Sequence, residues 1–206
     1  MNIVWPVTAL FGTVFRLWAY FRYGLDGVEH RATGDRDAAR KMPAEGQPLP
    51  VIVAKGTLHC GAGCMIGDAI AEWLAYAVPA VAIWLGWQTA FAQKIFAVSV
   101  LDFAFAFCLG IVFQYLAIVP MRKVSFGQGL VAALKADTLS LASWQIGMYG
   151  FLAFAQFCCF KLAFGIQAEV DTPEFWFAMQ LAMMAGFMTA YPVNWWLIRI
   201  DVKESM

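Results

Sequence analysis

The chain has few charged side chains and no excess of either sign. Only 14% of its 206 residues are Asp, Glu, Lys or Arg, and 14 basic residues balance 14 acidic ones. It therefore lacks the basic surface with which proteins bind nucleic acid. Its five cysteines are an odd number, and they are not spaced like the disulfide framework of a small secreted protein. We expect neither a nucleic-acid partner nor a disulfide scaffold.

Motifs of common enzyme classes are also missing. The sequence contains no Gly-rich phosphate loop, no serine nucleophile elbow and no HExxH zinc motif. No pair of nucleophile and general base is visible, so we do not expect an enzyme. The chain has no internal repeat either, which gives no support to a transporter built from two similar halves.

Apolar residues, in contrast, are abundant. They make up 62% of the chain, against roughly 45–50% in soluble domains, and the mean hydropathy is +0.66. Helices need about 20 such residues to cross a bilayer, and five runs meet this requirement: 2–21, 59–87, 95–119, 139–164 and 175–198. We predict an all-α fold, a polytopic membrane helix bundle of about five transmembrane helices.

The charges between these runs predict the organisation of the chain. We expect an N-terminal transmembrane helix over 1–21, a cytoplasmic linker over 22–56 and a four-helix transmembrane domain over 57–206. Most Lys and Arg residues of the connecting segments fall on one side, whereas the loop before the last run is acidic. By the positive-inside rule, the N-terminus lies outside and the C-terminus is cytoplasmic.

The segment HCGAGCMIGDAIAEW, residues 59–73, departs most from a generic membrane helix. Cys60, Cys64, Asp68 and Glu72 follow one another at four-residue spacing and would form one helical stripe. Carboxylates inside a membrane are costly and persist mainly within bundles, pores or ion sites. We expect Cys60 at the cytoplasmic mouth and Glu72 near the midplane, with no Lys or Arg at the depth of Glu72.

Small residues form a second stripe beside the first. Gly63, Gly67, Ala71 and Ala75 recur at the same spacing, a pattern that lets a neighbouring helix approach closely. The sequence therefore predicts that Gly63 and Gly67 lie at a close helix crossing, and that the polar stripe faces protein rather than lipid.

Two thiols and an imidazole are ligands that suit Cu(I) or Zn(II). The proposed metal ligands are His59, Cys60, Cys64, Asp68 and Glu72. Two alternatives stay open: the cysteines are small packing residues, or the carboxyl groups make only helix-to-helix hydrogen bonds.

Other predicted helices carry polar residues at a similar depth. The candidates for a shared vestibule are Gln114, Asp137, Gln145, Tyr191 and Asn194. Asp137 is equally well explained as a first-turn charge or N-cap of its helix. Asp102, near the outer end of its run, is either an exit-side polar group or an interfacial residue.

Three segments together resemble a known family. They are KGTLHCGAGCMIGDAIAEW, then KADTLSLASWQIGMYG at 135–150, then FWFAMQLAMMAGFMTAYPVNWWLI at 175–198. They resemble the bacterial membrane family catalogued as domain of unknown function 4396, from about Lys55 to the C-terminus. The resemblance implies a small helical domain of the bacterial inner membrane and brings no established activity, although some members are associated with copper. The motif positions are His59, Cys60, Cys64, Gly67, Asp68, Glu72, Asp137, Gln145, Tyr191, Pro192 and Asn194.

These observations favour an integral inner-membrane protein that handles or transports a soft metal ion, with copper as the best candidate. A structural or assembly subunit beside a larger membrane complex is the alternative. A third interpretation is a proton-coupled carrier of a small solute that uses Asp68 and Glu72. We expect the partners to be the lipid bilayer and either further copies of the chain or the other subunits of a membrane complex.

Overall fold

The computed structural model describes residue 21 and residues 48–122, 126–200 and 202–203. The predicted first span and most of the linker over 22–56 lie outside these ranges. The described part is all helical apart from its turns, as predicted. Its elements are α4 (Leu49–Ala77), α5 (Ala80–Trp84), α6 (Lys94–Arg122), α7 (Phe126–Phe154), the π-helix η1 (Ala155–Phe160), α8 (Lys161–Phe164) and α9 (Pro173–Arg199).

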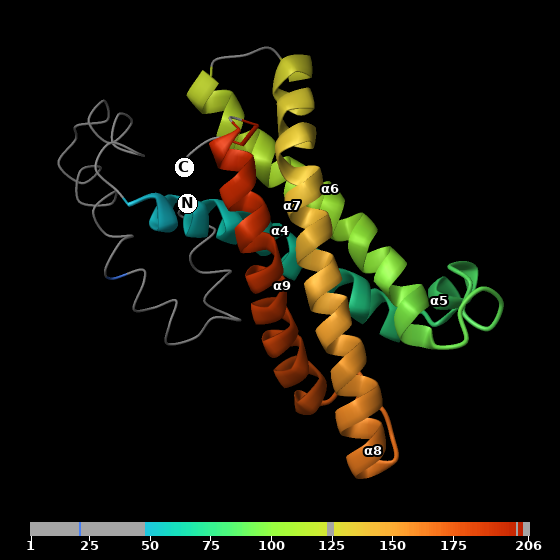
Figure 1. The fold of residues 1–206 in the computed structure, drawn as a ribbon. Helices are drawn as coiled ribbons and strands as arrows, with labels where there is room; N and C mark the ends of the chain where they lie inside the picture. The colour runs from blue at the N-terminus through green and yellow to red at the C-terminus, as the bar shows by residue number, and fades with distance from the viewer. Residues whose placement is uncertain (1–20, 22–47, 123–125, 201, 204–206) are drawn as a thin grey trace.

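Four long helices, α4, α6, α7 and α9, make up the described bundle. Each of them runs in the direction opposite to the long helix before it in the chain (Figure 1). α4 packs most extensively on α6, and α7 runs beside α9 (Figure 1). The α4–α6 and α8–α9 connections meet at one end, where Lys94 Nζ lies 3.8 Å from Glu169 Oε2 and the Tyr76 hydroxyl donates to Asp171. We call this the Glu169 end; α4 begins and α9 ends at the opposite end.

Three of the described helical segments are long and apolar enough to cross a membrane: Leu49–Ala77, Lys94–Phe113 and Asp137–Phe164. They correspond to the second, third and fourth predicted spans. α9, the predicted fifth span, is long enough but is the least apolar of the four long helices. Large apolar side chains also point outwards, such as Ile146 at 72% and Met188 at 74% exposure, as expected for surfaces that face lipid.

The second predicted span begins earlier and ends earlier than expected. α4 starts at Leu49 because Pro48 and Pro50 stand at its cap and first turn, where a missing N–H costs nothing. It stops at Ala77 because Pro79 disfavours helical geometry at Val78. The last residues of the predicted linker are therefore helical.

The predicted close crossing of small residues is confirmed, and its partner is α6. A Cβ added at Gly63 would lie 2.9 Å from Gly110 Cα, and one added at Gly67 would lie 2.5 Å from the backbone nitrogen of Ala106. The backbones of α4 and α6 are in contact along this seam. Glycine at these positions is what permits the two helices to pack so closely.

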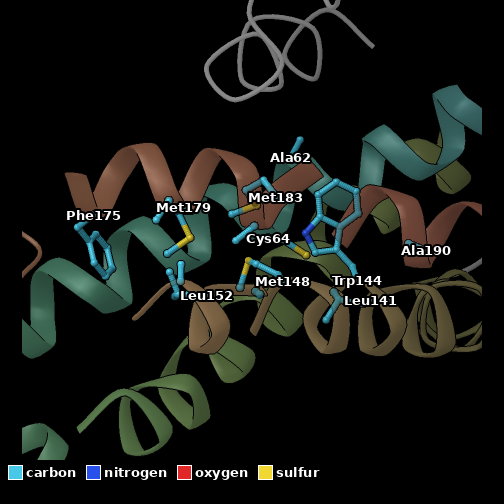
Figure 2. Close-up of a cluster of buried hydrophobic side chains, with 14 of the residues drawn as sticks. Ala62, Cys64, Leu141, Trp144, Met148, Leu152, Phe175, Met179, Met183 and Ala190 are labelled. Carbon is cyan, nitrogen blue, oxygen red and sulfur yellow. The ribbon is translucent and has the colours of Figure 1, made fainter. Parts of the chain in front are cut away.

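Trp144 fills the centre of the bundle. Its side chain is fully buried, and its ring leaves no room for a Cβ at Gly61 of α4 or at Gly186 of α9. Figure 2 shows the ring among Ala62, Leu141 and Met148 in the main hydrophobic cluster. Trp144 of α7 thus joins three helices.

Candidate functional site

A buried polar cluster lies towards the end of the bundle where α4 begins. Lys203, just after α9, places its Nζ 2.8 Å from Cys60 Sγ, 3.4 Å from Asp137 Oδ1 and 3.4 Å from Ser140 Oγ. Cys60 Sγ donates to Asp137 Oδ1 at 2.6 Å, and Asn194 Nδ2 donates to Ser140 Oγ at 2.7 Å. We call these five residues the Lys203 cluster; α4, α7, α9 and the segment after α9 all contribute to it.

The two charged residues of this cluster, Lys203 and Asp137, form an ion pair that is shielded from solvent. The side chains of Lys203 and Asp137 are 0% and 1% exposed. Burial alone would lower the pKa of the Lys203 ammonium, but the neighbouring Cys60 and Asp137 side chains outweigh burial and raise that pKa above its ordinary value. Lys203 is therefore charged at neutral pH.

A second group of polar side chains lies between the Lys203 cluster and the Glu169 end. Asp68 of α4 and Asp102 of α6 are fully buried, and Glu72 is 6% exposed. The three carboxyl groups are close enough to interact electrostatically. Gln145 Nε2 donates to Asp68 Oδ1 at 3.2 Å, and Tyr149 on the same face of α7 lies within electrostatic range of both aspartates. We call these five residues the carboxyl cluster.

Several atoms of the carboxyl cluster have no hydrogen-bond partner among the described residues. They are Asp68 Oδ2, Asp102 Oδ1, Gln145 Oε1 and the Tyr149 hydroxyl. Buried polar atoms are nearly always paired in native proteins. Unpaired oxygens on two acids, an amide and a phenol therefore leave free hydrogen-bonding capacity in the interior of the bundle.

A lysine lies near Glu72, which the sequence analysis did not expect. Lys94, at the start of α6, lies within electrostatic range of Glu72, as does Glu169. Because α4 ends at Ala77, Glu72 lies near the Glu169 end, and Asp68 takes the more central position. Asp102 is buried at 1% exposure, so its side chain lies in the interior of the bundle.

The proposed metal ligands do not converge on one point. Among the residues that the structure describes, no group of three or more His, Cys, Asp and Glu side chains is arranged to hold a metal ion. His59 Nε2 contacts the Phe113 carbonyl at 3.0 Å, Cys60 belongs to the Lys203 cluster, and Asp68 belongs to the carboxyl cluster.

The predicted vestibule separates into different sites. Asp137 and Asn194 lie in the Lys203 cluster, and Gln145 lies in the carboxyl cluster. The Tyr191 hydroxyl donates to the Pro50 carbonyl at 3.3 Å, so it contacts the start of α4. The side chain of Gln114 lies outside the described part of α6.

Two site residues escaped the sequence analysis. Lys203 follows the last apolar run and was counted as a cytoplasmic charge; no local pattern indicates that it turns back into the bundle. Tyr149 does carry a signal, because it stands four residues after Gln145 and so lies on the same face of its helix.

The described part of the chain is thus a helical bundle in which three helices are long and apolar enough to cross a membrane, with acids and a lysine buried in its interior. The chain matches the family described as Domain of unknown function (DUF4396) over residues 51–203. It belongs to that family, and the match contains both polar clusters in full. No curated protein and no solved structure matches the chain.

Proposed function

We propose that this chain is a multi-pass protein of the bacterial inner membrane that moves protons through the bundle, coupled to the movement of a small solute. The carboxyl cluster supports this proposal: three buried acids and a tyrosine meet on three helices, with unpaired oxygens among them. The predicted orientation, with the C-terminus in the cytoplasm, places the Lys203 cluster on the cytoplasmic side.

The argument begins with the energy of buried charge. A carboxylate in a low-dielectric interior is strongly disfavoured unless a proton or a cation binds it. Nothing that the structure describes gives Asp68 or Asp102 a hydrogen bond or ion pair with Lys or Arg. Such acids exchange protons as their surroundings change, and two of them close together share the charge.

The positions of the acids suggest a route. Glu72 lies near Lys94 and Glu169 at the end of the bundle, and it interacts with Asp68 and Asp102 further in. Beyond Asp68 along α4, the buried Cys64 side chain lies between the carboxyl cluster and the Lys203 cluster, within electrostatic range of Asp68 and Asp137. In the proposed mechanism, this conformation connects the acids with the Glu169 end and is closed at the other end. Carriers require such a one-sided state, because a route open at both ends would leak protons.

Asp68→Asn is expected to reduce proton movement to the level of protein-free vesicles, because the amide keeps the shape and the hydrogen bonds of the neutral acid but cannot release a proton. Purified protein is reconstituted into liposomes that contain a pH-sensitive dye, and proton uptake is driven by a potassium diffusion potential. Glu174→Gln is the control, since it removes one negative charge at an exposed position at the start of α9.

Two results would contradict the proposal. Wild-type vesicles that take up protons no faster than empty ones, with or without added solutes, would favour the assembly-subunit alternative. An Asp68→Asn protein that conducts protons as fast as the wild type would show that the carboxyl cluster only joins helices.

Handling of a soft metal is the second candidate, and one observation favours it. Cys64, Met148, Met179 and Met183 belong to one buried cluster, and Figure 2 shows their sulfur atoms within the same part of the core. Thiolate and thioether groups are the ligands that select Cu(I). In this version of the metal hypothesis, Cys64 and methionines bind the ion, and Zn(II) is disfavoured because thioethers bind it poorly.

If the sulfur atoms bind Cu(I), purified protein will retain copper under reducing conditions, and the Cys64→Ser, Met148→Leu double variant will lose it. Elemental analysis after gel filtration in mild detergent measures the metal content. Cys158→Ser is the matched control, because Cys158 is exposed. Equal copper in the double variant and the wild type, or none in the wild type, would argue against this candidate.

A further inference from the structure

We propose that the Lys203 cluster is the cargo site of the carrier, that its cargo is an unbranched primary alkylammonium ion, and that the Lys203 side chain occupies this site in the closed state. The assignment of cargo rests on the proposed function. The binding of an amine to the cluster can be measured without transport.

The first argument is the fit between an ammonium group and the cluster. A primary ammonium has three N–H donors and no acceptor. Lys203 Nζ finds three acceptors on two helices, Cys60 Sγ on α4 and the Asp137 and Ser140 side chains on α7. Asn194 of α9 donates a hydrogen bond to the Ser140 hydroxyl and so orients it. This is a complete binding site for R–NH3+, with one carboxylate to balance its charge.

The shape around the lysine stem is the second argument. A Cβ added at Gly56 would lie 3.9 Å from Lys203 Cε and 4.0 Å from Ile198 Cδ1. The stem therefore passes over Gly56, between α4 and the end of α9, at van der Waals distance from a Cβ that would stand there. A straight alkyl chain of the length of the lysine stem reproduces this path, so an n-alkylammonium ion is the cargo that we propose.

The third argument is that the lysine and its acceptors belong to different parts of the fold. The acceptors belong to long helices, but Lys203 follows the end of α9 and its segment is held by backbone hydrogen bonds from Val202 and Lys203 to the Leu197 carbonyl. Val202 beside it is 40% exposed. Movement of this short segment would remove the ammonium and leave the site intact.

Departure of Lys203 would leave the site with an unbalanced buried charge, which favours a cation as its replacement. Without Lys203, the Asp137 carboxylate stays buried with no partner for its charge, and its Oδ2 has no hydrogen-bond partner among the described residues even when Lys203 is present. An uncompensated buried charge is strongly unfavourable. A cation from solution that replaces the lysine removes this penalty, so binding of cargo and release of Lys203 are alternatives.

The test uses n-butylammonium, which reproduces the lysine stem and its head group. Isothermal titration of the purified full-length protein measures its binding, and hydrogen exchange detected by mass spectrometry measures the amides of Val202 and Lys203. We expect butylammonium to bind the wild type and to speed exchange at both amides. Lys203→Ala, which removes the competitor, should bind butylammonium at least about tenfold more tightly, equivalent to about 1.4 kcal/mol. Lys203→Ala combined with Asp137→Asn should not bind it.

The controls separate an ammonium site from a simple hole. Butan-1-ol has the same chain without the charge, and tetramethylammonium has the charge without the N–H donors; neither should bind Lys203→Ala. Lys94→Ala removes the lysine of the partly exposed Lys94–Glu169 pair at the opposite end of the bundle and should bind butylammonium as the wild type does. If Lys203→Ala does not fold, the exchange measurement on the wild type still decides.

The inference is overturned if butylammonium leaves amide exchange in the wild type unchanged at saturating concentration, if Lys203→Ala binds no more tightly, or if butan-1-ol binds equally well. Proton uptake by the wild type in liposomes together with any of these results would leave the proposed function intact and remove only the cargo. Amine binding without proton uptake in any condition would leave the site and remove the carrier.

Discussion

Lys203→Met is expected to lower the free energy of unfolding by about 3–5 kcal/mol, the usual cost of removing one partner from a buried ion pair. Methionine has nearly the length and volume of the lysine stem, so packing over Gly56 is retained. The loss comes from Asp137, whose carboxylate would remain buried without its cation. Reversible unfolding in mixed detergent micelles, followed by circular dichroism, measures the difference.

A double-mutant cycle distinguishes this mechanism from lost packing. Lys203→Met combined with Asp137→Leu removes both charges, and replacing a whole buried pair with apolar groups is often nearly neutral. We expect the double variant to be more stable than Lys203→Met alone. Lys94→Met is the matched control, because its partner Glu169 is 59% exposed; loss of such a surface pair costs about 1 kcal/mol or less. Strictly additive effects of Lys203 and Asp137 would show that the two charges do not depend on each other.

The helices of the bundle could be predicted because the lipid leaves few alternatives. Apolar runs long enough to cross a bilayer must be helical, since backbone groups find no water there. The first and last residues of each helix are harder to predict, because hydropathy alone does not show where a helix continues into a polar segment. Pro48 and Pro50 favour the start of α4 and Pro79 favours its end, and these local signals locate the helix better than the apolar run does.

The stripe on α4 was predictable from its spacing, but the partners of its residues were not. Cys60 and Asp68 lie on one face of α4, as their separation by a multiple of four residues indicates. Cys60 contacts Asp137 and Asp68 contacts Gln145, and in each pair the two residues are 77 positions apart in sequence. Such pairings depend on how α4 and α7 cross, and no local pattern contains that angle.

Lys203 shows most clearly where sequence reasoning ends. A lysine after the last apolar run is normally a solvated, cytoplasmic charge. Here the segment after α9 turns back, and the lysine is buried because Asp137 and Cys60 lie beneath it. Glu72 illustrates the same point from the other end, since Lys94 approaches it only because the α4–α6 connection brings the two helix ends together.

The glycine seam, in contrast, was predicted from sequence alone and confirmed, and it leads to the second large effect. Gly67→Leu should destabilise the protein by more than about 3 kcal/mol, the upper part of the range usual for overpacking in a well-packed core. A Cβ at this position would already lie 2.6 Å from Ala106 Cα and 2.8 Å from the Phe105 carbonyl carbon. These are backbone atoms of a helix, and they cannot rotate away as a side chain would.

Gly150→Leu is the matched control for this substitution. Gly150 also lies inside a long helix, α7, but a Cβ there meets nothing within 4 Å. The same change at Gly150 should be neutral or slightly stabilising, since leucine has the higher helix propensity. Thermal unfolding of both variants in detergent, with the wild type alongside, gives the comparison.

Because Asp68 follows Gly67 and Asp102 lies one helical turn before Ala106, separation of α4 from α6 would also pull the two aspartates apart. If the Gly67→Leu protein unfolds at the same temperature as the wild type, α4 and α6 do not touch along this seam. The carboxyl cluster would then lack the geometry on which the proposed proton movement depends.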